Sequence, residues 1–192
     1  MPRFERPVGR LPERCPVTVT TAPRTDWLAA HQEILRRKTL AAPVEGHAEH
    51  AHAITDLLVA YAVHYDAGDL DSMIELFEPD ATYESLLGRC EGHDALRANF
   101  APLIARYART AHLVVNSTVH VTSSTAADAV SYLHALVQTR DGIAYGLCGS
   151  YQDQVTRRSG TWRIARRFVA DGLAYRTEQI EPADRLPPAP TQ

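Results

Sequence analysis

Several residue types and patterns are scarce in this 192-residue chain, and each scarcity narrows what the protein can be. Lys38 is the only lysine, and the formal net charge of −3 gives no reason to expect nucleic acid or an anionic membrane as a partner. No apolar run is long enough to span a bilayer, and the N-terminal residues lack the apolar core of a signal peptide. We therefore expect a cytoplasmic protein without nucleic-acid or membrane partners.

Cysteines and nucleotide-binding motifs are equally sparse. Cys15, Cys90 and Cys148 are odd in number and widely spaced, so we expect reduced thiols rather than a disulfide framework. The chain contains neither a GxGxxG loop nor a Walker-type GxxxxGK loop, so no nucleotide cofactor is implied.

One histidine cluster raises the question of a metal. The stretch GHAEHAH places His47, His50 and His52 close together, but its spacing matches none of the zinc patterns, and no helical HExxH is present. The cluster also lies at the start of a predicted helix, outside the expected pocket. We therefore predict that the protein needs no metal and no other cofactor.

What is present fits one globular domain with extensions, since 45% of the residues are hydrophobic and 22% are charged. Residues 1–45 are predicted to form an N-terminal extension. Its first 24 residues hold five prolines without periodicity, and a short helix follows at about 25–40, packed on the main domain or on a partner chain. The main domain is expected over 46–178, and 179–192 form a Pro-rich tail.

The first part of the main domain has helical spacing. Apolar residues recur at intervals of three and four from residue 54 to residue 65, and Gly68 is suited to end that helix. A second short helix is predicted over 69–77, capped by Asp69 or Asp71. The stretch PDATYES resembles a turn into a strand, and a third helix is predicted over 92–109 with Asp94 as its N-cap.

After residue 109 the apolar period changes to two. Four consecutive long strands are predicted over 110–123, 126–139, 142–157 and 161–176. Asp141-Gly142 and Ser159-Gly160 stand where tight hairpins need such residues. Helices followed by an antiparallel meander indicate an α+β fold, with one curved sheet wrapped over helices.

The order of these segments resembles a known family. ITDLLVAYAVHYDAGDLDSMIELFEPDATYES, EGHDALRANF, AHLVVNSTVHV and GSYQDQVTRRSGTWRIARR, within residues 48–175, resemble the SnoaL-like group of the nuclear-transport-factor-2-like superfamily. The resemblance implies a cone-like, cystatin-like sheet. The superfamily includes scytalone and bile-acid dehydratases, ketosteroid isomerase, limonene epoxide hydrolase, polyketide cyclases and the small subunits of aromatic-ring dioxygenases, so the fold alone does not select one activity.

The resemblance also implies site residues. YDAGDLD is similar to the scytalone dehydratase stretch in which a tyrosine and an aspartate line the pocket, which corresponds to Tyr65 and Asp66. Tyr61 matches the pocket tyrosine of the bile-acid dehydratases, and His112 in TAHLVVN matches the active-site histidine of the first meander strand. For a further polar partner on the next strand, this chain offers Tyr132 and His134. No aspartate matches the catalytic base that polyketide cyclases carry on the sheet, which favours dehydratase-like chemistry.

The residues themselves permit two interpretations of Asp66 and of the tyrosines. Asp66 is in the last helical turn, where the negative end of the helix dipole and partial burial would raise its pKa. A charged histidine beside it would instead lower that pKa and form an ion pair. It could equally cap the turn before the next helix. Tyr61 and Tyr65 have core spacing, so packing alone would explain them, although their hydroxyls need partners.

The strands carry the remaining candidates. Strict alternation from His112 places it on one face with Asn116 and His120, and places Leu113, Val115, Val119 and Val121 on the other. His112 could then be held by Asp66 as an acid and base, or be a half-exposed polar residue. Trp162, Ile164, Arg166 and Phe168 are predicted to share a face, from which Arg166 reaches the pocket mouth or pairs with an acid.

Together these features predict a cofactor-independent lyase or isomerase, dehydratase- or cyclase-like, that acts on an apolar oxygenated metabolite of the polyketide type. Asp66, His112, Tyr61 and Tyr65 are the predicted catalytic residues. Substrate contacts are predicted for Tyr132, His134, Asn116 and Arg166. The alternative is a non-catalytic ligand-binding protein or a small subunit of an aromatic-ring dioxygenase. A homodimer or other homo-oligomer is expected, because one face of a curved open sheet is apolar and needs a cover.

Overall fold

A computed structural model describes residues 27–42 and 44–177, without the side chains of Trp27, Asp171 and Thr177. The predicted proline-rich arm and tail lie outside the described residues. Four helices and six strands follow in the order α1 (Trp27–Leu40), α2 (His47–Ala67), α3 (Leu70–Glu75), β1 (Phe77–Ser85), β2 (Gly88–Glu91), α4 (His93–Arg106), β3 (Tyr107–Ser123), β4 (Ala126–Thr139), β5 (Ala144–Thr156) and β6 (Arg163–Thr177). Runs of helix and then strand confirm the α+β prediction.

The helix ends follow from local chemistry. Gly68 takes a left-handed conformation with φ 71° after α2, and its N–H reaches the carbonyls of the last turn. Asp69 caps α3, since its carboxylate accepts a hydrogen bond from the Ser72 backbone N–H at 3.1 Å. The N-cap predicted for α4 is wrong. Gly92 occupies that position, and Asp94 lies inside the first turn, where a carboxylate still favours the helix dipole.

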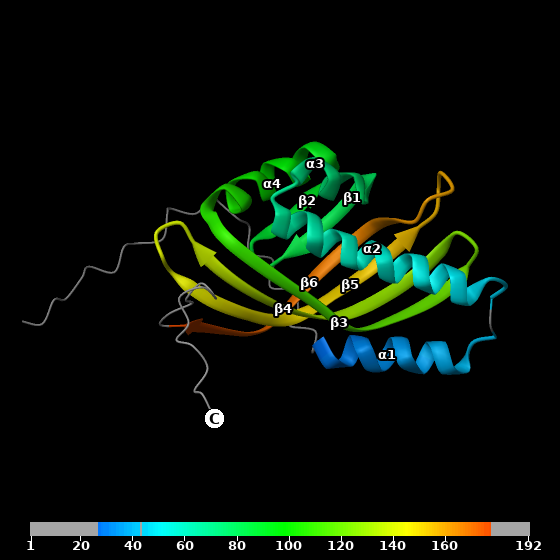
Figure 1. The fold of residues 1–192 in the computed structure, drawn as a ribbon. Helices are drawn as coiled ribbons and strands as arrows, with labels where there is room; N and C mark the ends of the chain where they lie inside the picture. Colours follow the sequence, from blue (N-terminus) through cyan, green and yellow to red (C-terminus); the bar gives the residue numbers. More distant parts are fainter. Residues whose placement is uncertain (1–26, 43, 178–192) are drawn as a thin grey trace, which may run out of the picture.

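The six strands form one curved sheet in the order β2-β1-β6-β5-β4-β3 (Figure 1). Strands β3 to β6 form the predicted antiparallel meander. β1 pairs with β6 in parallel, and the short β2 extends the edge beyond β1. The residue pattern predicts neither β2 nor the parallel pairing, because a strand of four residues between two turns carries little periodicity.

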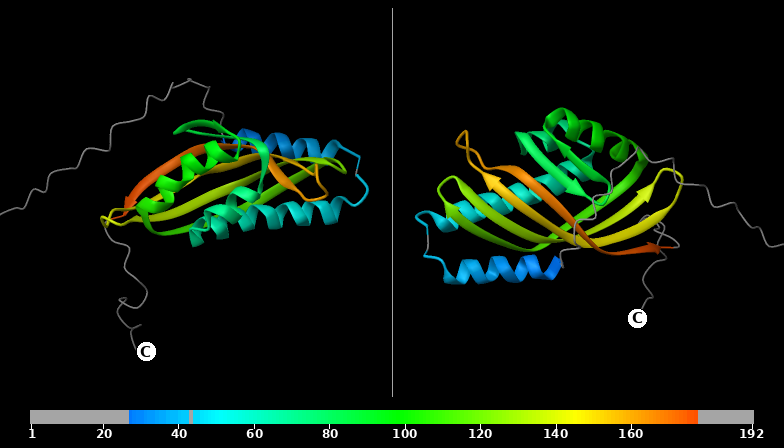
Figure 2. Two further views of the ribbon diagram at one scale, coloured as in Figure 1. Left: turned by 90° about the horizontal axis from the view of Figure 1, so that it is seen from above. Right: turned by 180° about the vertical axis from the view of Figure 1, so that it is seen from behind.

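The sheet has two differently covered faces (Figures 1 and 2). We call the face covered by α2, α3 and α4 the inner face, and the face against which α1 lies the outer face. The main hydrophobic core fills the inner face, with residues such as Leu58 and Ile74 from the helices and Val121 and Ile164 from the strands, all almost fully buried. α1 covers only part of the outer face, where Leu113 and Leu173 remain exposed.

A β-bulge at Asn116 changes which residues of β3 share a face. Asn116 has a φ of 51°, and the pairing with β4 shifts between Val115 and Thr118. His112 therefore lies on the inner face together with Val119, while His120 lies on the outer face opposite Asp128. The prediction that His112 and His120 share a face is wrong, because strict alternation does not survive an extra residue.

Candidate active site

The structure brings Asp66 and His112 into direct contact on the inner side of the sheet. Asp66 Oδ1 lies 2.6 Å from His112 Nδ1 and accepts a hydrogen bond from Thr110 Oγ1 at 2.7 Å. Asp66 Oδ2 accepts one from the backbone N–H of His112 at 2.7 Å. Since an ionised carboxylate can only accept, this arrangement holds the proton of the neutral imidazole on Nδ1 and leaves Nε2 as the basic nitrogen.

Local geometry explains how the two residues meet. Asp66 stands in the last turn of α2, one residue before the end of the helix, and β3 passes beside that turn. Thr110 and His112 are two apart on a strand, so both face the helix and both can donate to the same carboxylate. We call these three residues the Asp66 cluster.

The pKa of Asp66 lies below its ordinary value, not above it. Burial raises the pKa, but hydrogen bonds from the His112 ring, from Thr110 and from the His112 backbone lower it by more. The raised pKa considered from the helix dipole is therefore wrong, because the sequence did not show how many donors converge on the carboxylate. Asp66 is suited to hold and orient His112 rather than to carry a proton itself.

Tyr65 lies beside the imidazole. The centroids of its ring and of the His112 ring are 4.5 Å apart, and the two side chains are 8% and 9% exposed. Burial raises the pKa of Tyr65 well above its ordinary value. The phenol therefore keeps its proton at neutral pH and can donate a hydrogen bond to a substrate oxygen.

Tyr61 lies one helical turn further from Asp66, in the packed core. It is 1% exposed, and burial raises its pKa to about 12. The guanidinium carbon of Arg167 lies 4.1 Å from the centroids of both the Tyr61 and the Tyr151 ring. Packing, which the sequence left open as an explanation for Tyr61, therefore accounts for its ring, and a cation–π stack fixes it.

The charge in that stack is balanced by a buried carboxylate. Arg167 Nε and Nη2 donate to Asp153 at 2.7 and 2.9 Å, and both side chains are fully buried. Nη1 of Arg167 has no hydrogen-bond partner. This pair was not predicted from the sequence. A usable signal was the spacing of two residues that places the pair on the same strand face as apolar core residues. Arg167 is two residues from Val169 on β6, and Asp153 lies between Tyr151 and Val155 at the same spacing on β5.

The residues predicted to contact substrate are not at the Asp66 cluster. Tyr132 lies on the outer face, 4.3 Å from the His31 ring of α1, and His134 on the same face meets the Tyr175 hydroxyl at 2.8 Å. Asn116 forms the bulge. We therefore withdraw the prediction that Tyr132, His134 and Asn116 contact substrate at this site.

Arg166 is also on the outer face, where its guanidinium is 3.9 Å from the Glu84 carboxylate. The face predicted for β6 is wrong because the pairing with β5 shifts between Gln154 and Val155, so Ile164 points inward and Arg166 outward. Its predicted substrate contact at the Asp66 cluster is therefore withdrawn as well.

The histidine cluster at residues 47–52 falls in the first two turns of α2. His52 lies 3.5 Å from Asp56, while His50 packs edge-on against Trp162 with ring centroids 5.4 Å apart. In the part of the chain that the structure describes, no group of three or more His, Cys, Asp or Glu side chains is arranged to hold a metal ion. No described helix is both long and apolar enough to cross a membrane.

Comparison with known sequences identifies the domain. Residues 46–168 match the family model of the SnoaL-like domain. An uncharacterized protein of Mycobacterium tuberculosis (strain ATCC 25618 / H37Rv) is 29% identical over 117 residues, which cover 59% of this chain and 80% of the relative.

Solved structures share the fold at low identity. A candidate scytalone dehydratase from Novosphingobium aromaticivorans DSM 12444 has a TM-score of 0.65 at 21% identity, covering 74% of this chain and 99% of that chain. A hexachlorocyclohexane dehydrochlorinase, LinA type 2, has a TM-score of 0.64 at 17% identity, covering 71% of this chain and 93% of that chain. The β subunit of a candidate aromatic-ring-hydroxylating dioxygenase from Novosphingobium aromaticivorans DSM 12444 has a TM-score of 0.56 at 19% identity. The match covers 64% of this chain and 88% of that chain. The predicted cystatin-like, nuclear-transport-factor-2-like fold is confirmed.

Proposed function

The chain belongs to the SnoaL-like domain family, and on this premise we propose that it is a cofactor-independent lyase or isomerase acting on an apolar, oxygenated small molecule. The observation that carries the proposal is the contact between His112 Nδ1 and the ionised Asp66 carboxylate at 2.6 Å. A buried, oriented imidazole with one basic nitrogen is the group that general acid–base catalysis requires near neutral pH.

In the dehydration version of the reaction, His112 Nε2 removes a proton from the carbon next to a substrate carbonyl. The C–H electron pair forms an enolate, and the Tyr65 hydroxyl donates a hydrogen bond to its oxygen. The carbonyl then re-forms, a carbon–carbon double bond forms, and the hydroxyl on the carbon next to the deprotonated one leaves. That hydroxyl accepts the proton from Nε2 and departs as water. The product is an α,β-unsaturated carbonyl compound, and His112 returns to its starting state. An isomerase would return the same proton to another carbon.

The neighbouring groups support this chemistry through position and charge. Asp66 favours the imidazolium that forms after proton removal, because the carboxylate lies against Nδ1. The rings of Tyr61 and Tyr65 are neighbours, with centroids 6.1 Å apart, and the guanidinium of the buried Arg167 stacks on the Tyr61 ring. Tyr61 and Arg167 are therefore positioning residues that act through Tyr65, whereas Asp66 acts through His112.

The structural neighbours add support of a general kind. A dehydratase removes water and a dehydrochlorinase removes hydrogen chloride, so both names describe an elimination in which a proton is lost. Polyketide-type intermediates, which carry hydroxyl groups beside carbonyl groups, suit the dehydration version. The dioxygenase β subunit supports a second candidate, a non-catalytic subunit of an oxygenase.

A turnover assay on the purified chain separates the two candidates. β-Hydroxy ketones with an aromatic or alicyclic body serve as substrates, and enone formation is followed by ultraviolet absorbance without added cofactor. We expect turnover that His112→Ala abolishes. His134→Ala is the matched control, because it removes a histidine from the outer face of the adjacent strand. Equal turnover by wild type and His112→Ala, or none across the series, would leave the non-catalytic subunit as the better explanation.

A further inference from the structure

A cavity lies on the opposite side of the sheet from the Asp66 cluster. It has a volume of about 470 Å³ and lies between α1 and the outer face. Residues of α1 form one wall, among them Ala30, Ile34 and Arg37. Strands β1, β4, β5 and β6 form the other wall. The volume suits a small organic molecule.

Strand register defines the sheet wall of this cavity. Val130, Gln152, Phe168 and Glu84 form one row across four strands. Asp128, Gln154, Arg166 and Thr82 form the next row. The first row places the Gln152 amide between two apolar side chains, Val130 and Phe168, and Ile34 lines the opposite wall. The centre of the cavity is therefore apolar except for one amide.

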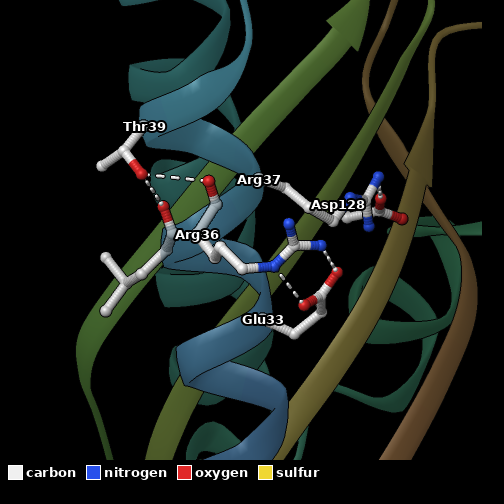
Figure 3. A network of polar contacts seen from close by, with 6 residues as sticks. Glu33, Arg36, Arg37, Thr39 and Asp128 are labelled. Carbon is white, nitrogen blue, oxygen red and sulfur yellow. Dashed lines mark hydrogen bonds and ion pairs between the residues drawn. The ribbon is translucent and has the colours of Figure 1, made fainter.

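The charged groups at the cavity are matched in pairs. Arg37 of α1 lies 2.8 Å from Asp128, and Glu33 accepts from Arg36 on its own helix at 2.8 and 2.9 Å (Figure 3). Arg166 lies 3.9 Å from Glu84. Each carboxylate of the outer-face wall therefore has a guanidinium beside it, and no unbalanced charge remains to attract an ion.

One residue of the cavity lining carries an unsatisfied polar atom. Nε2 of Gln152 is buried and has no hydrogen-bond partner. A buried donor without an acceptor is destabilising, and such atoms in native proteins need an explanation. An acceptor oxygen on a bound molecule would supply the missing partner.

We propose that this cavity, here called the α1 cavity, binds a small uncharged molecule with an apolar body and one carbonyl oxygen. The oxygen accepts a hydrogen bond from Gln152 Nε2, and the body packs between Phe168, Val130 and Ile34. The site is separate from the Asp66 cluster, because the side chains that line it alternate along β5 and β6 with the inward Asp153 and Arg167. It does not depend on the proposed lyase or isomerase activity.

The proposal is tested by nuclear magnetic resonance of the full chain labelled with nitrogen-15, titrated with three probes of similar size. Acetophenone carries the carbonyl, ethylbenzene lacks the oxygen, and benzoate replaces it with a charge. We expect saturable shifts for acetophenone at the amides of residues 33–37, 128–130, 152–154 and 166–168. Ethylbenzene and benzoate should both bind more weakly than acetophenone, by roughly three- to tenfold. Ethylbenzene offers the Gln152 amide no acceptor, and benzoate must lose the hydration of its charge.

Variants locate the contact. Gln152→Leu should weaken acetophenone binding by roughly three- to tenfold and leave ethylbenzene binding unchanged or tighter. Gln154→Leu is the matched control, since Gln154 belongs to the same strand and cavity but is exposed. Ala30→Trp, which fills the cavity from α1, should abolish binding even if Gln152→Leu does not fold. His112→Ala should have no effect.

Three results would overturn the proposal. The first is equal affinity for acetophenone and ethylbenzene, which would mean that no polar atom recognises the ligand. The second is an equal loss in Gln152→Leu and Gln154→Leu. The third is a set of shifts confined to the amides around residues 61–66 and 110–112, which would place the ligand at the Asp66 cluster instead.

Discussion

The carboxylate of Asp66 holds both the ring and the backbone of His112. Oδ1 lies 2.6 Å from the ring Nδ1, and Oδ2 lies 2.7 Å from the backbone nitrogen. One side chain at the end of α2 thus fixes the orientation of the imidazole and the position of the strand that carries it. The two residues should therefore behave as one unit in both stability and catalysis.

Coupling between Asp66 and His112 can be measured with a double-mutant cycle. We expect Asp66→Asn and His112→Ala each to lower turnover by about a hundredfold or more, in line with general acid–base contributions. The double variant should be little worse than the worse single variant, because residues that act as a unit are not additive. Losses that multiply in the double variant would mean that the two residues act separately.

Stability should depend on acid through Asp66. Its folded-state pKa is lower than the 3.8 ordinary for an aspartate. The stabilisation is therefore fully present above about pH 4 and is lost as pH falls through the folded-state value. Chemical denaturation from pH 6 to pH 2.5 should show the free-energy difference between wild type and Asp66→Asn shrinking towards low pH.

Thr110→Val provides the matched test of that pH dependence. It removes one of the donors that lower the pKa of Asp66, so stability should be lost at a higher pH than in wild type. Thr118→Val, on the same strand beyond the bulge, is the control. A loss at the same pH in Thr110→Val and wild type would contradict the role assigned to the Thr110 hydroxyl.

The buried pair of Arg167 and Asp153 should be costly to break from one side. Asp153→Ala leaves a guanidinium uncompensated at a position with 0% exposure, and we expect a loss of about 3–5 kcal/mol in the free energy of unfolding. Replacing both partners by Met and Leu should restore much of that loss, because the desolvation penalty of both charges disappears. Urea denaturation measures both values. A single variant as stable as wild type would show that water reaches the pair.

An exposed ion pair is the control for that measurement. Arg158 lies 2.7 Å from Asp80, with the side chains 53% and 63% exposed. Asp80→Ala should change stability little, because solvent screens the charges and ordering the side chains has an entropic cost.

The bulge at Asn116 should tolerate glycine and resist a β-branched residue. Its φ of 51° is in the left-handed region, which glycine adopts freely and valine does not. We expect Asn116→Gly to be close to wild type in thermal denaturation and Asn116→Val to lose about 1–2 kcal/mol. Ser117→Val at the neighbouring position, whose φ is negative, should lose less. Equal losses at the two positions would mean that the backbone conformation is not the cause.

We propose a homo-oligomer that covers the open part of the outer face. Leu113 and Val115 of β3 are 48% and 46% exposed there, and Leu173 and Tyr175 of β6 are 69% and 43% exposed. Sedimentation at micromolar concentration should detect the assembly, and Leu173→Asp should dissociate it. Val63→Asp is the control, since Val63 is 58% exposed on α2, away from that face. A strictly monomeric wild type would contradict the proposal.

Local patterns were sufficient for most of the elements. The period of two predicted β4 over its full extent, and the spacing from Ile54 to Tyr65 with Gly68 after it predicted α2. These predictions succeeded because helical and strand periodicity, like the left-handed conformation of glycine, depends on residues close together in the chain. The contact between Asp66 and His112 was also predicted from the sequence, through the resemblance to a family rather than through periodicity.

Tertiary structure alone decided which face the strand residues beyond each bulge occupy, and whether the pKa of Asp66 is raised or lowered. Bulges in β3 and β6 reversed the alternation, so His120 and Arg166 face α1 while Arg167 enters the core. The pKa of Asp66 is lowered because His112 and Thr110, more than forty residues away along the chain, both donate to its carboxylate. Hydrogen bonds and ion pairs between distant segments exist only once the sheet has folded onto α2, and no local pattern encodes their number or direction.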